Sequence, residues 1–352
     1  MRILMLNFER GFRGGERQTL LCLRRLKQTG YDVALIARAG SELADAAINE
    51  GIRTYIEKSR IGVCKRLLLL RKSYDIFHAQ TANMLTWLVI MKPFLKGYVV
   101  FTRRTAFPIS KRESFTKLKW RQVDLFVAVI EAAAAEPRRL GVKVDVIIPS
   151  AIEFKEPNED NIKALREQFV GDSKYCIATA AALTPEKGTL TLIKAINVLH
   201  KQRDDFVFVH FGGGGASEAE ARALVSKLGL EKVYKFAGFR SDISDCFRIM
   251  DVFVLASEFE AQGGSVLEAF MYGVPVTCTF AGGLKEVISQ GRGLGCEVGD
   301  YQGMASNIKR LLDDKLIRES QISKASKLVY EKHTPDSMVK QYIDAYKRLV
   351  KQ

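Results

Sequence analysis

The chain has 352 residues, of which 47% are hydrophobic and 27% are charged, and its formal net charge is +14. These proportions are those of a globular protein and exclude a disordered chain, and the length suits two domains. No run reaches the ~18 apolar residues of a membrane-spanning helix, and the six cysteines form no CxxC pair. We therefore expect a cytoplasmic protein without a transmembrane helix, a signal peptide, a zinc site or disulfides.

Short apolar runs alternate with amphipathic stretches along the whole chain. RILMLNF, DVALIA, IFHA, YVVFT, LFVAV and VDVIIP predict strands in the first half; YCIATAAAL, FVFVHFG, VYKFAG, VFVLAS and PVTCTF predict strands in the second. Such runs, alternating with helices, indicate parallel sheets covered on both faces. The sequence predicts two Rossmann-like α/β domains, 1–153 and 154–334, and a C-terminal helix within 335–352 that packs back on the first domain.

Three turns at expected strand ends could receive a ligand. In NFERGFRGGERQ, Gly14 and Gly15 precede a helix expected near Glu16, so the backbone could approach an anion; a plain strand-to-helix turn is the alternative. In ALTPEKG, Lys187 could neutralise a phosphate, or be an ordinary surface lysine. In FVFVHFGGGG, the turn containing Gly213 suits a nucleotide, or is a flexible surface loop.

The segment SEFEAQGGSVLEAFMYGVPV, residues 257–276, contains two glutamates eight positions apart. Glu260 and Glu268 bracket Gly263, Gly264 and Ser265, and we expect a helix from Glu268 to a C-cap at Gly273. Free N–H groups at the helix start could hold a diphosphate, and a nearby carboxylate could accept two hydrogen bonds from a ribose diol. A pair of helix-capping acids is the alternative.

Together these motifs resemble the family-four retaining glycosyltransferases of GT-B fold, which use nucleotide sugars. Their S-x-x-E-G-x-G-x-x-x-x-E-A signature is similar to SEFEAQGGSVLEA here, matching at Ser257, Glu260, Gly263, Glu268 and Ala269. GVPV, AGGLKEVI, FGGGG, KVYKFAGF and ALTPEKG also resemble the family. The resemblance implies two Rossmann-like domains facing each other across a central cleft, the first for the acceptor and the second for the donor. It also implies a bacterial lipopolysaccharide or cell-envelope type of enzyme.

The resemblance assigns roles residue by residue. Glu268 would bind the nucleotide ribose, Glu260 the hydroxyls of the donor sugar, and Lys187 the distal phosphate. Glu260, Lys187 and Arg104 are the expected catalytic residues. The expected donor-binding set is Gly14, Gly15, Lys187, Gly213, Phe239, Glu260, Gly263, Gly264, Ser265, Val266 and Glu268.

The sequence departs from the family where G-R-L usually precedes the lysine. Ala181, Ala182 and Leu183 stand there, so one arginine is missing. FTRRTAF places Arg104 where many members carry a histidine, and Arg103 or Arg104 could supply the charge. Because no D-x-D triplet occurs, we expect no metal; no cofactor is expected beyond the nucleotide-sugar substrate, for which UDP is one candidate nucleotide.

The excess positive charge lies in the first half of the sequence. Residues 1–150 hold 27 Lys and Arg against 13 Asp and Glu, which accounts for the whole excess of +14. Within them, segments 58–73 and 110–122 mix basic residues with leucines or aromatics, which suits an anionic membrane surface, although an ordinary charged surface helix is the alternative. We expect a protein peripheral on the inner face of the cytoplasmic membrane, with a glycan or glycolipid acceptor and no nucleic acid.

Two other functions remain open from the sequence. A GT-B-fold isomerase, such as a nucleotide-sugar 2-epimerase, shares the fold but lacks this two-glutamate context. A basic nucleic-acid-binding protein would explain the charge, but the chain has no recognisable reading motif.

Overall fold

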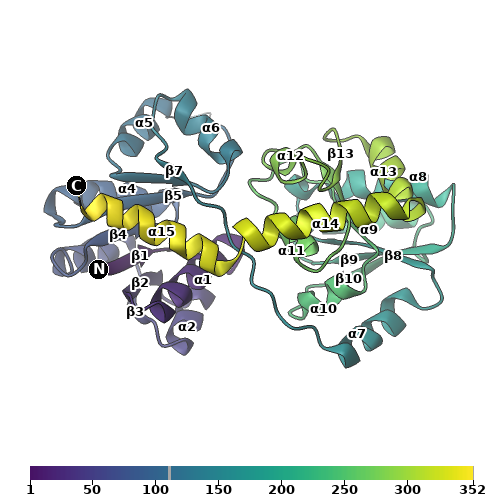
Figure 1. Ribbon diagram of the computed structural model, residues 1–352, viewed down its shortest axis with the longest axis horizontal. Coiled ribbons are helices and arrows are strands. Elements are labelled where there is room, and N and C mark those ends of the chain that lie inside the picture. Colours follow the sequence, from purple (N-terminus) through teal and green to yellow (C-terminus); the bar gives the residue numbers. More distant parts are fainter. Residues whose placement is uncertain (110–111, 352) are drawn as a thin grey trace. The chain divides into compact units, whose positions relative to one another are not determined.

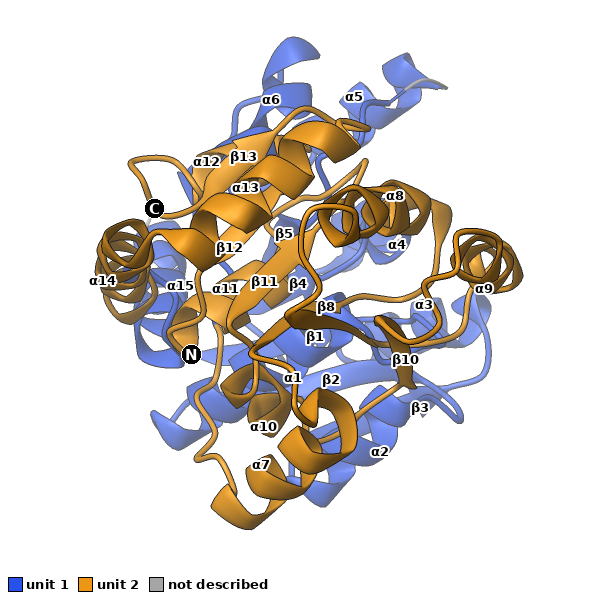
Figure 2. Cartoon of the chain, turned by 90° about the vertical axis from the view of Figure 1, so that its right-hand side faces the viewer, with its two compact units in different colours: residues 1–151, 332–352 blue, residues 152–331 orange. Residues whose placement is uncertain are grey.

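The structure is a computed structural model that describes residues 1–109 and 112–351. It consists of two compact units: unit 1 comprises residues 1–151 and 332–352, and unit 2 comprises residues 152–331 (Figure 2). The predicted domain limits, after 153 and 334, lie within three residues of these. The predicted fold class, two parallel-sheet α/β domains, is confirmed.

The described part of unit 1 forms a parallel sheet in the order β3-β2-β1-β4-β5-β6-β7. Its strands are β1 (Arg2–Leu6), β2 (Asp32–Arg38), β3 (Arg53–Glu57), β4 (Ile76–Ala79), β5 (Tyr98–Arg103), β6 (Leu125–Ala128) and β7 (Val146–Ile147). Its helices are α1 (Gly14–Gln28), α2 (Glu42–Asn49), α3 (Arg60–Leu69), α4 (Ala82–Met91), the short η1 (Lys92–Phe94), α5 (Glu113–Arg121), α6 (Glu131–Arg139) and α15 (Pro335–Val350).

Alternation along β1 divides the core of unit 1 into two layers. Ile3 and Met5 pack into a cluster with α1, α2 and α15, whereas Leu4 and Leu6 pack with α3, α4 and α5 on the other face. Side chains of successive strand residues point to opposite faces, so a run that is apolar throughout must be covered twice. The C-terminal helix α15 thereby completes the core of unit 1 and lies against α1 (Figure 1).

Unit 2 forms a second parallel sheet in the order β10-β9-β8-β11-β12-β13. Its strands are β8 (Tyr175–Ala180), β9 (Phe206–Phe211), β10 (Tyr234–Gly238), β11 (Val252–Leu255), β12 (Val276–Thr279) and β13 (Leu294–Cys296). Its helices are α7 (Glu159–Leu165), η2 (Arg166–Val170), η3 (Pro185–Lys187), α8 (Thr189–His200), α9 (Glu218–Lys227), α10 (Ile243–Arg248), α11 (Gly264–Met271), α12 (Leu284–Val287), α13 (Tyr301–Asp313) and α14 (Lys315–Lys332).

The strand order reverses once in each sheet. In unit 1 the reversal lies between β1 and β4, and in unit 2 it lies between β8 and β11. The connections leave neighbouring strands in opposite directions there, so a crevice forms at the carboxyl ends, where open α/β sheets bind their ligands. The loops after β1, β4, β8 and β11 are therefore the places to look for a site.

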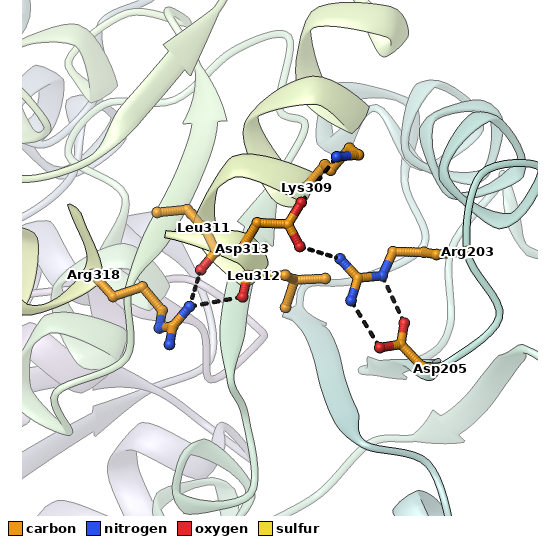
Figure 3. Close-up of polar contacts among 7 residues, drawn as sticks. All are labelled: Arg203, Asp205, Lys309, Leu311, Leu312, Asp313 and Arg318. Atoms are coloured by element: carbon orange, nitrogen blue, oxygen red, sulfur yellow. Dashed lines mark hydrogen bonds and ion pairs between the residues drawn. The ribbon is translucent and has the colours of Figure 1, made fainter. Parts of the chain in front are cut away.

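Charged side chains stabilise the opposite end of the sheet in unit 2, where the strands begin. Arg203, in the connection from α8 to β9, donates to Asp205 at 2.6 and 2.8 Å and to Asp313 at 2.9 Å (Figure 3). Arg318 of α14 donates to the last two carbonyl groups before Asp313. This network joins α13 and α14 to the amino-terminal end of β9 and leaves the carboxyl ends of the strands to the site.

Three local predictions were wrong or incomplete. The strands β3 and β13 were not predicted, because RTYIE is half polar and LGC is short and contains a glycine. Helix α11 begins at Gly264 and not at Glu268, whereas α1 begins at Gly14, within two residues of its predicted start near Glu16. Among residues 1–109 and 112–351, no helix combines the length and the apolar character needed to cross a bilayer.

Candidate functional site

A lysine and a glutamate meet at the strand reversal of unit 2. Lys187 ends the short η3 after β8, and Glu260 lies in the loop after β11. The Lys187 Nζ donates to Glu260 Oε2 at 2.5 Å, with 27% and 17% of the two side chains exposed. The structure thus brings together two of the predicted catalytic residues from loops 73 positions apart.

The two loops are locked to each other by backbone contacts. The Glu258 N–H of one loop donates to the Glu186 carbonyl of the other at 2.8 Å, and the Gly283 N–H, from the loop after β12, donates to the Glu260 carbonyl at 3.1 Å. Gly188 has φ 62°, and a Cβ on it would lie 2.0 Å from the Ala256 oxygen. Only glycine therefore permits this close approach, which fixes the position of the Lys187 loop beside the end of β11.

The first turn of α11 follows directly after Glu260. Gly263, the N-cap, has φ 71°, and a Cβ there would lie 2.4 Å from a methyl group of Leu284. The N–H groups of Gly264 and Ser265 have no acceptor among the described residues, as expected at a helix start. Val266 is fully buried and its N–H donates to the Gly263 carbonyl at 2.9 Å, so it supports the turn instead of offering a polar group.

Glu268 lies one turn inside α11, because the helix starts four residues before it. Its side chain is half-buried. Side chains on a helix generally lean toward its N-terminus, which for Glu268 is the turn that carries Gly264 and Ser265. Glu268 is therefore not a residue of the first turn, and its role in binding the ribose stays a prediction.

A buried histidine supports the neighbouring glycine loop. His210 of β9 lies 3.1 Å from the Ala181 carbonyl through Nε2 and 2.9 Å from the Tyr234 hydroxyl through Nδ1. Burial lowers its pKa to about 4, so the ring is neutral, donating to Ala181 and accepting from Tyr234. Sequence analysis missed this residue, although a lone polar side chain inside FVFVHF was a usable signal.

The loop after β9 packs tightly on the end of β8. Gly212 and Gly215 have φ 123° and 132°, and a Cβ on either would lie within 2.3 Å of a backbone oxygen of the 181–183 segment. Gly213 has only ordinary contacts, with the backbone at Gly238 and Phe239. Phe239 is 73% exposed beside it, which is unusual for a large aromatic ring and suits stacking on a flat ligand.

The glycine turn of unit 1 has open space around it. A Cβ on Gly14 or Gly15 would meet nothing within 4 Å, and neither residue has a positive φ. Neither backbone conformation nor packing inside unit 1 therefore requires glycine here. Glu16, which is buried, accepts from the Arg13 N–H at 3.0 Å and from the Asn7 amide at 3.3 Å, and so anchors the turn.

The arginines of FTRRTAF have partners inside unit 1. Arg104 donates to Gln80 at 2.8 Å and to Ser150 at 3.3 Å. Arg103 donates to the Phe107 carbonyl at 2.5 Å and lies over the Trp120 ring, 5.1 Å from its centroid. Both guanidinium groups stabilise unit 1, and the catalytic role of Arg104 stays a prediction.

No cluster of three or more His, Cys, Asp or Glu side chains that could hold a metal ion is found within the described ranges. In unit 2, the groups that could bind an anion are the Lys187 ammonium and the N–H groups at the start of α11, and the Glu260 carboxylate lies beside them. These are a cation, a carboxylate and free donors in a small area, which is a set suited to a phosphorylated ligand with hydroxyl groups.

Comparison with known proteins gives a consistent picture. Residues 161–328 match the family model described as glycosyl transferases group 1. N-acetyl-alpha-D-glucosaminyl L-malate synthase of Bacillus anthracis is 34% identical over 38% of this chain, but the match spans only 35% of that relative's length. Lipopolysaccharide core biosynthesis glycosyltransferase LpsD of Rhizobium meliloti is 23% identical over 99% of this chain and 98% of its own.

Among solved structures, Anabaena HepE in complex with UDP superposes with a TM-score of 0.89. The superposition covers 99% of this chain and 100% of HepE, at 19% sequence identity. At that identity the likeness shows the fold, which is GT-B.

Proposed function

Residues 161–328 match the family model of the group 1 glycosyl transferases, and we propose that the chain transfers a sugar from a nucleoside-diphosphate sugar to a hydroxyl group of a glycan or glycolipid acceptor. The observation that carries the proposal is the Lys187–Glu260 pair beside the free N–H groups of α11. Lys187, Gly264 and Ser265 offer positive groups to a diphosphate, and Glu260 offers acceptor oxygens to the sugar hydroxyls.

The remaining donor contacts follow from the same arrangement. Glu268 would accept hydrogen bonds from the ribose hydroxyls, and the exposed Phe239 ring would stack on the base. HepE, which shares the fold, is a UDP complex, and this supports a uracil nucleotide as the first candidate. LpsD, which matches nearly the whole chain, carries the name of a lipopolysaccharide core enzyme, and this supports an envelope glycolipid as acceptor.

The proposed reaction requires no metal and no covalent intermediate. The bond between the anomeric carbon and the diphosphate oxygen breaks, and the acceptor oxygen bonds to the same carbon from the same face, which retains the configuration. The proton of the acceptor hydroxyl passes to the departing diphosphate. Lys187 and the helix N–H groups stabilise the negative charge that develops on that leaving group.

A basic and apolar surface on unit 1 supports a membrane-associated acceptor. Helices α3, α4 and α5 lie side by side over one face of the sheet. Residues 58–123 contain fifteen Lys and Arg but only two acidic residues, Asp75 and Glu113. Large apolar side chains are exposed on the same helices and on η1, namely Ile61, Leu68, Leu69, Ile90, Phe94, Phe115 and Leu118. Lys111, part of the predicted segment 110–122, lies outside the described residues.

This composition suits peripheral attachment to the anionic face of the cytoplasmic membrane. Each Lys or Arg near such a surface contributes about 1 kcal/mol, and exposed apolar side chains add to it by entering the interface. A glycolipid acceptor would then be presented to unit 1 in the plane of the membrane.

A panel of nucleotide sugars tests the proposal. The intact protein is incubated with each donor, with and without a crude glycolipid acceptor, and release of the nucleoside diphosphate is followed in the presence and absence of EDTA. We expect one donor to be used, with acceptor-dependent release that survives chelation. Conversion of the donor without any acceptor would indicate an isomerase, and no use of any donor would refute the proposal.

A further inference from the structure

A cavity of about 400 Å³ opens at the strand reversal of unit 1. It is lined by the loop after β1, the end of β2, the start of α3 and the start of α4. All of its lining residues belong to unit 1, and four of them are arginines: Arg10, Arg13, Arg38 and Arg60. None of the residues so far assigned to the donor lines it.

Among the described residues, the four cavity arginines lack carboxylate partners, whereas half of the other fourteen arginines of unit 1 have one. Seven others form ion pairs, namely Arg2, Arg24, Arg25, Arg53, Arg66, Arg138 and Arg139. The four cavity arginines form none with any residue in the described ranges. Four guanidinium groups left unpaired around one cavity repel one another unless an anion joins them.

The acidic residues of the cavity do not neutralise this charge. Glu16 is 7% exposed, and its two oxygens already accept from Asn7 and from the Arg13 N–H. Glu9 is the other carboxylate of the lining, so the formal balance of the cavity is four positive against two negative charges. A net charge of +2 matches a phosphomonoester, which carries about −1.5 to −2 at pH 7.

One of the arginines is already held in place. The Arg38 guanidinium lies over the ring of Phe8, 5.6 Å from its centroid, and that ring is itself buried. Stacking restricts the plane of the guanidinium and leaves its edge free for bidentate contact with a phosphate. The cavity therefore combines charge with a pre-oriented donor.

We propose that this cavity binds a phosphate group carried by the acceptor, so that the natural acceptor is a phosphorylated sugar. That the phosphate belongs to the acceptor rests on the proposed function, because only a glycosyl transfer requires a second substrate besides the nucleotide sugar. The anion site itself rests only on Arg10, Arg13, Arg38 and Arg60.

Calorimetric titration of the intact protein with glucose 6-phosphate as probe tests the site, with glucose and glucuronate as comparisons. Each titration is done alone and with UDP at saturation. We expect glucose 6-phosphate to bind in both conditions, glucuronate more weakly, and glucose not at all. Arg38→Met and Arg60→Met should each lower the affinity for glucose 6-phosphate by roughly tenfold or more. Arg121→Met, which removes an exposed arginine of the same unit outside the cavity, should change nothing.

Three results would overturn the inference. They are no binding of glucose 6-phosphate at millimolar concentration, equal effects of Arg60→Met and Arg121→Met, and complete displacement by UDP, which would mean that the arginines hold the donor diphosphate. Arg60 is exposed at the start of α3, so its substitution leaves the core intact if Arg38→Met does not fold. If UDP itself fails to bind, the proposed function fails, whereas the titration without UDP still decides the anion site.

Discussion

Lys187 and Glu260 form an ion pair in this structure, and we expect Glu260 to act in two ways. Its Oε2 holds the Lys187 Nζ at the strand reversal, at a distance of 2.5 Å. A donor diphosphate would compete for the same ammonium group, and Glu260 would turn to the sugar hydroxyls. The two residues should therefore respond differently to substitution.

Glu260→Gln should keep or strengthen binding of the bare nucleoside diphosphate, because it removes a competing negative charge, while turnover falls about a hundredfold or more. Lys187→Met should weaken nucleoside diphosphate binding by about tenfold or more. Calorimetry and steady-state rates measure both effects.

Arg203→Met is the matched control for this pair, since it removes another ion-paired cation of unit 2, at the amino-terminal end of the strands. It should lower the melting temperature and leave affinity unchanged. Equal weakening of the nucleotide by Glu260→Gln and Lys187→Met would contradict the assignment.

Glu268→Ala should lower the affinity for the nucleoside diphosphate by about tenfold, because the ribose hydroxyls lose a charged hydrogen-bond acceptor. Its affinity for pyrophosphate, which has no ribose, should stay the same. Competition binding with the two ligands separates these effects. Loss of pyrophosphate binding to the same degree would assign Glu268 to the architecture of the diphosphate site.

At the scale of elements, glycine is needed at Gly188 of unit 2 for a different physical reason than at Gly14 and Gly15 of unit 1. Gly188 allows two loops of unit 2 to touch, and a side chain there would collide with the Ala256 carbonyl. Gly14 and Gly15 open α1, where a side chain would collide with nothing inside unit 1. The first is required by the fold, and the others are explained if a substrate passes close to the backbone.

Gly15→Ala should therefore leave stability unchanged or raise it by up to about 1 kcal/mol, because alanine favours the helix, while turnover falls about tenfold or more. Gly188→Ala is the comparison and should lower stability sharply. Melting temperatures and initial rates of the two variants test the distinction. Full activity in Gly15→Ala would mean that no ligand approaches this turn.

At the scale of the whole molecule, each unit buries a neutral histidine in its core. Burial lowers the pKa of His78 to about 3 and that of His210 to about 4, both below the ordinary 6.5. His78 bonds Tyr346 of α15 and Thr102 of β5, and His210 bonds Ala181. His78 thus ties β4 to β5 and α15, and His210 ties β9 to β10 and to the loop after β8.

Stability should fall as the pH drops below about 6.5, because the unfolded chain takes up protons on these histidines before the folded chain does. Each contributes about 2 kcal/mol of loss between pH 7 and pH 5. Urea unfolding at the two pH values should show a smaller loss for His210→Gln than for the wild type. An unchanged loss would mean that His210 is not buried as a neutral ring.

The excess charge of unit 1 predicts salt-sensitive attachment to anionic vesicles. Co-sedimentation should be strong at low ionic strength and weak near 1 M salt, where the Debye length is about 3 Å. Leu69→Ser should weaken it further, since Leu69 is 72% exposed on the basic face. Leu316→Ser, at a leucine of unit 2 that is 77% exposed, is the control. Equal binding to neutral and anionic vesicles would exclude an electrostatic origin.

The sequence by itself determined the fold class and most of the strands, because buried parallel strands require apolar runs and the helices between them require amphipathic ones. It also determined the two-glutamate segment, since that pattern is continuous in the chain. It did not predict β3 or β13, where edge strands need few apolar residues, nor the start of α11 at Gly264.

Only the tertiary structure decided which distant residues meet. Lys187 and Glu260 are joined because β8 and β11 are neighbours at the strand reversal, and His210 is placed under Ala181 by the register of β8 and β9. The cavity with Arg10, Arg38 and Arg60 is likewise made by strand order, since Arg10 follows β1, Arg38 ends β2 and Arg60 follows β3. Local sequence sets the period and propensity of each element, whereas pairing between elements depends on packing over long separations, which no local pattern encodes.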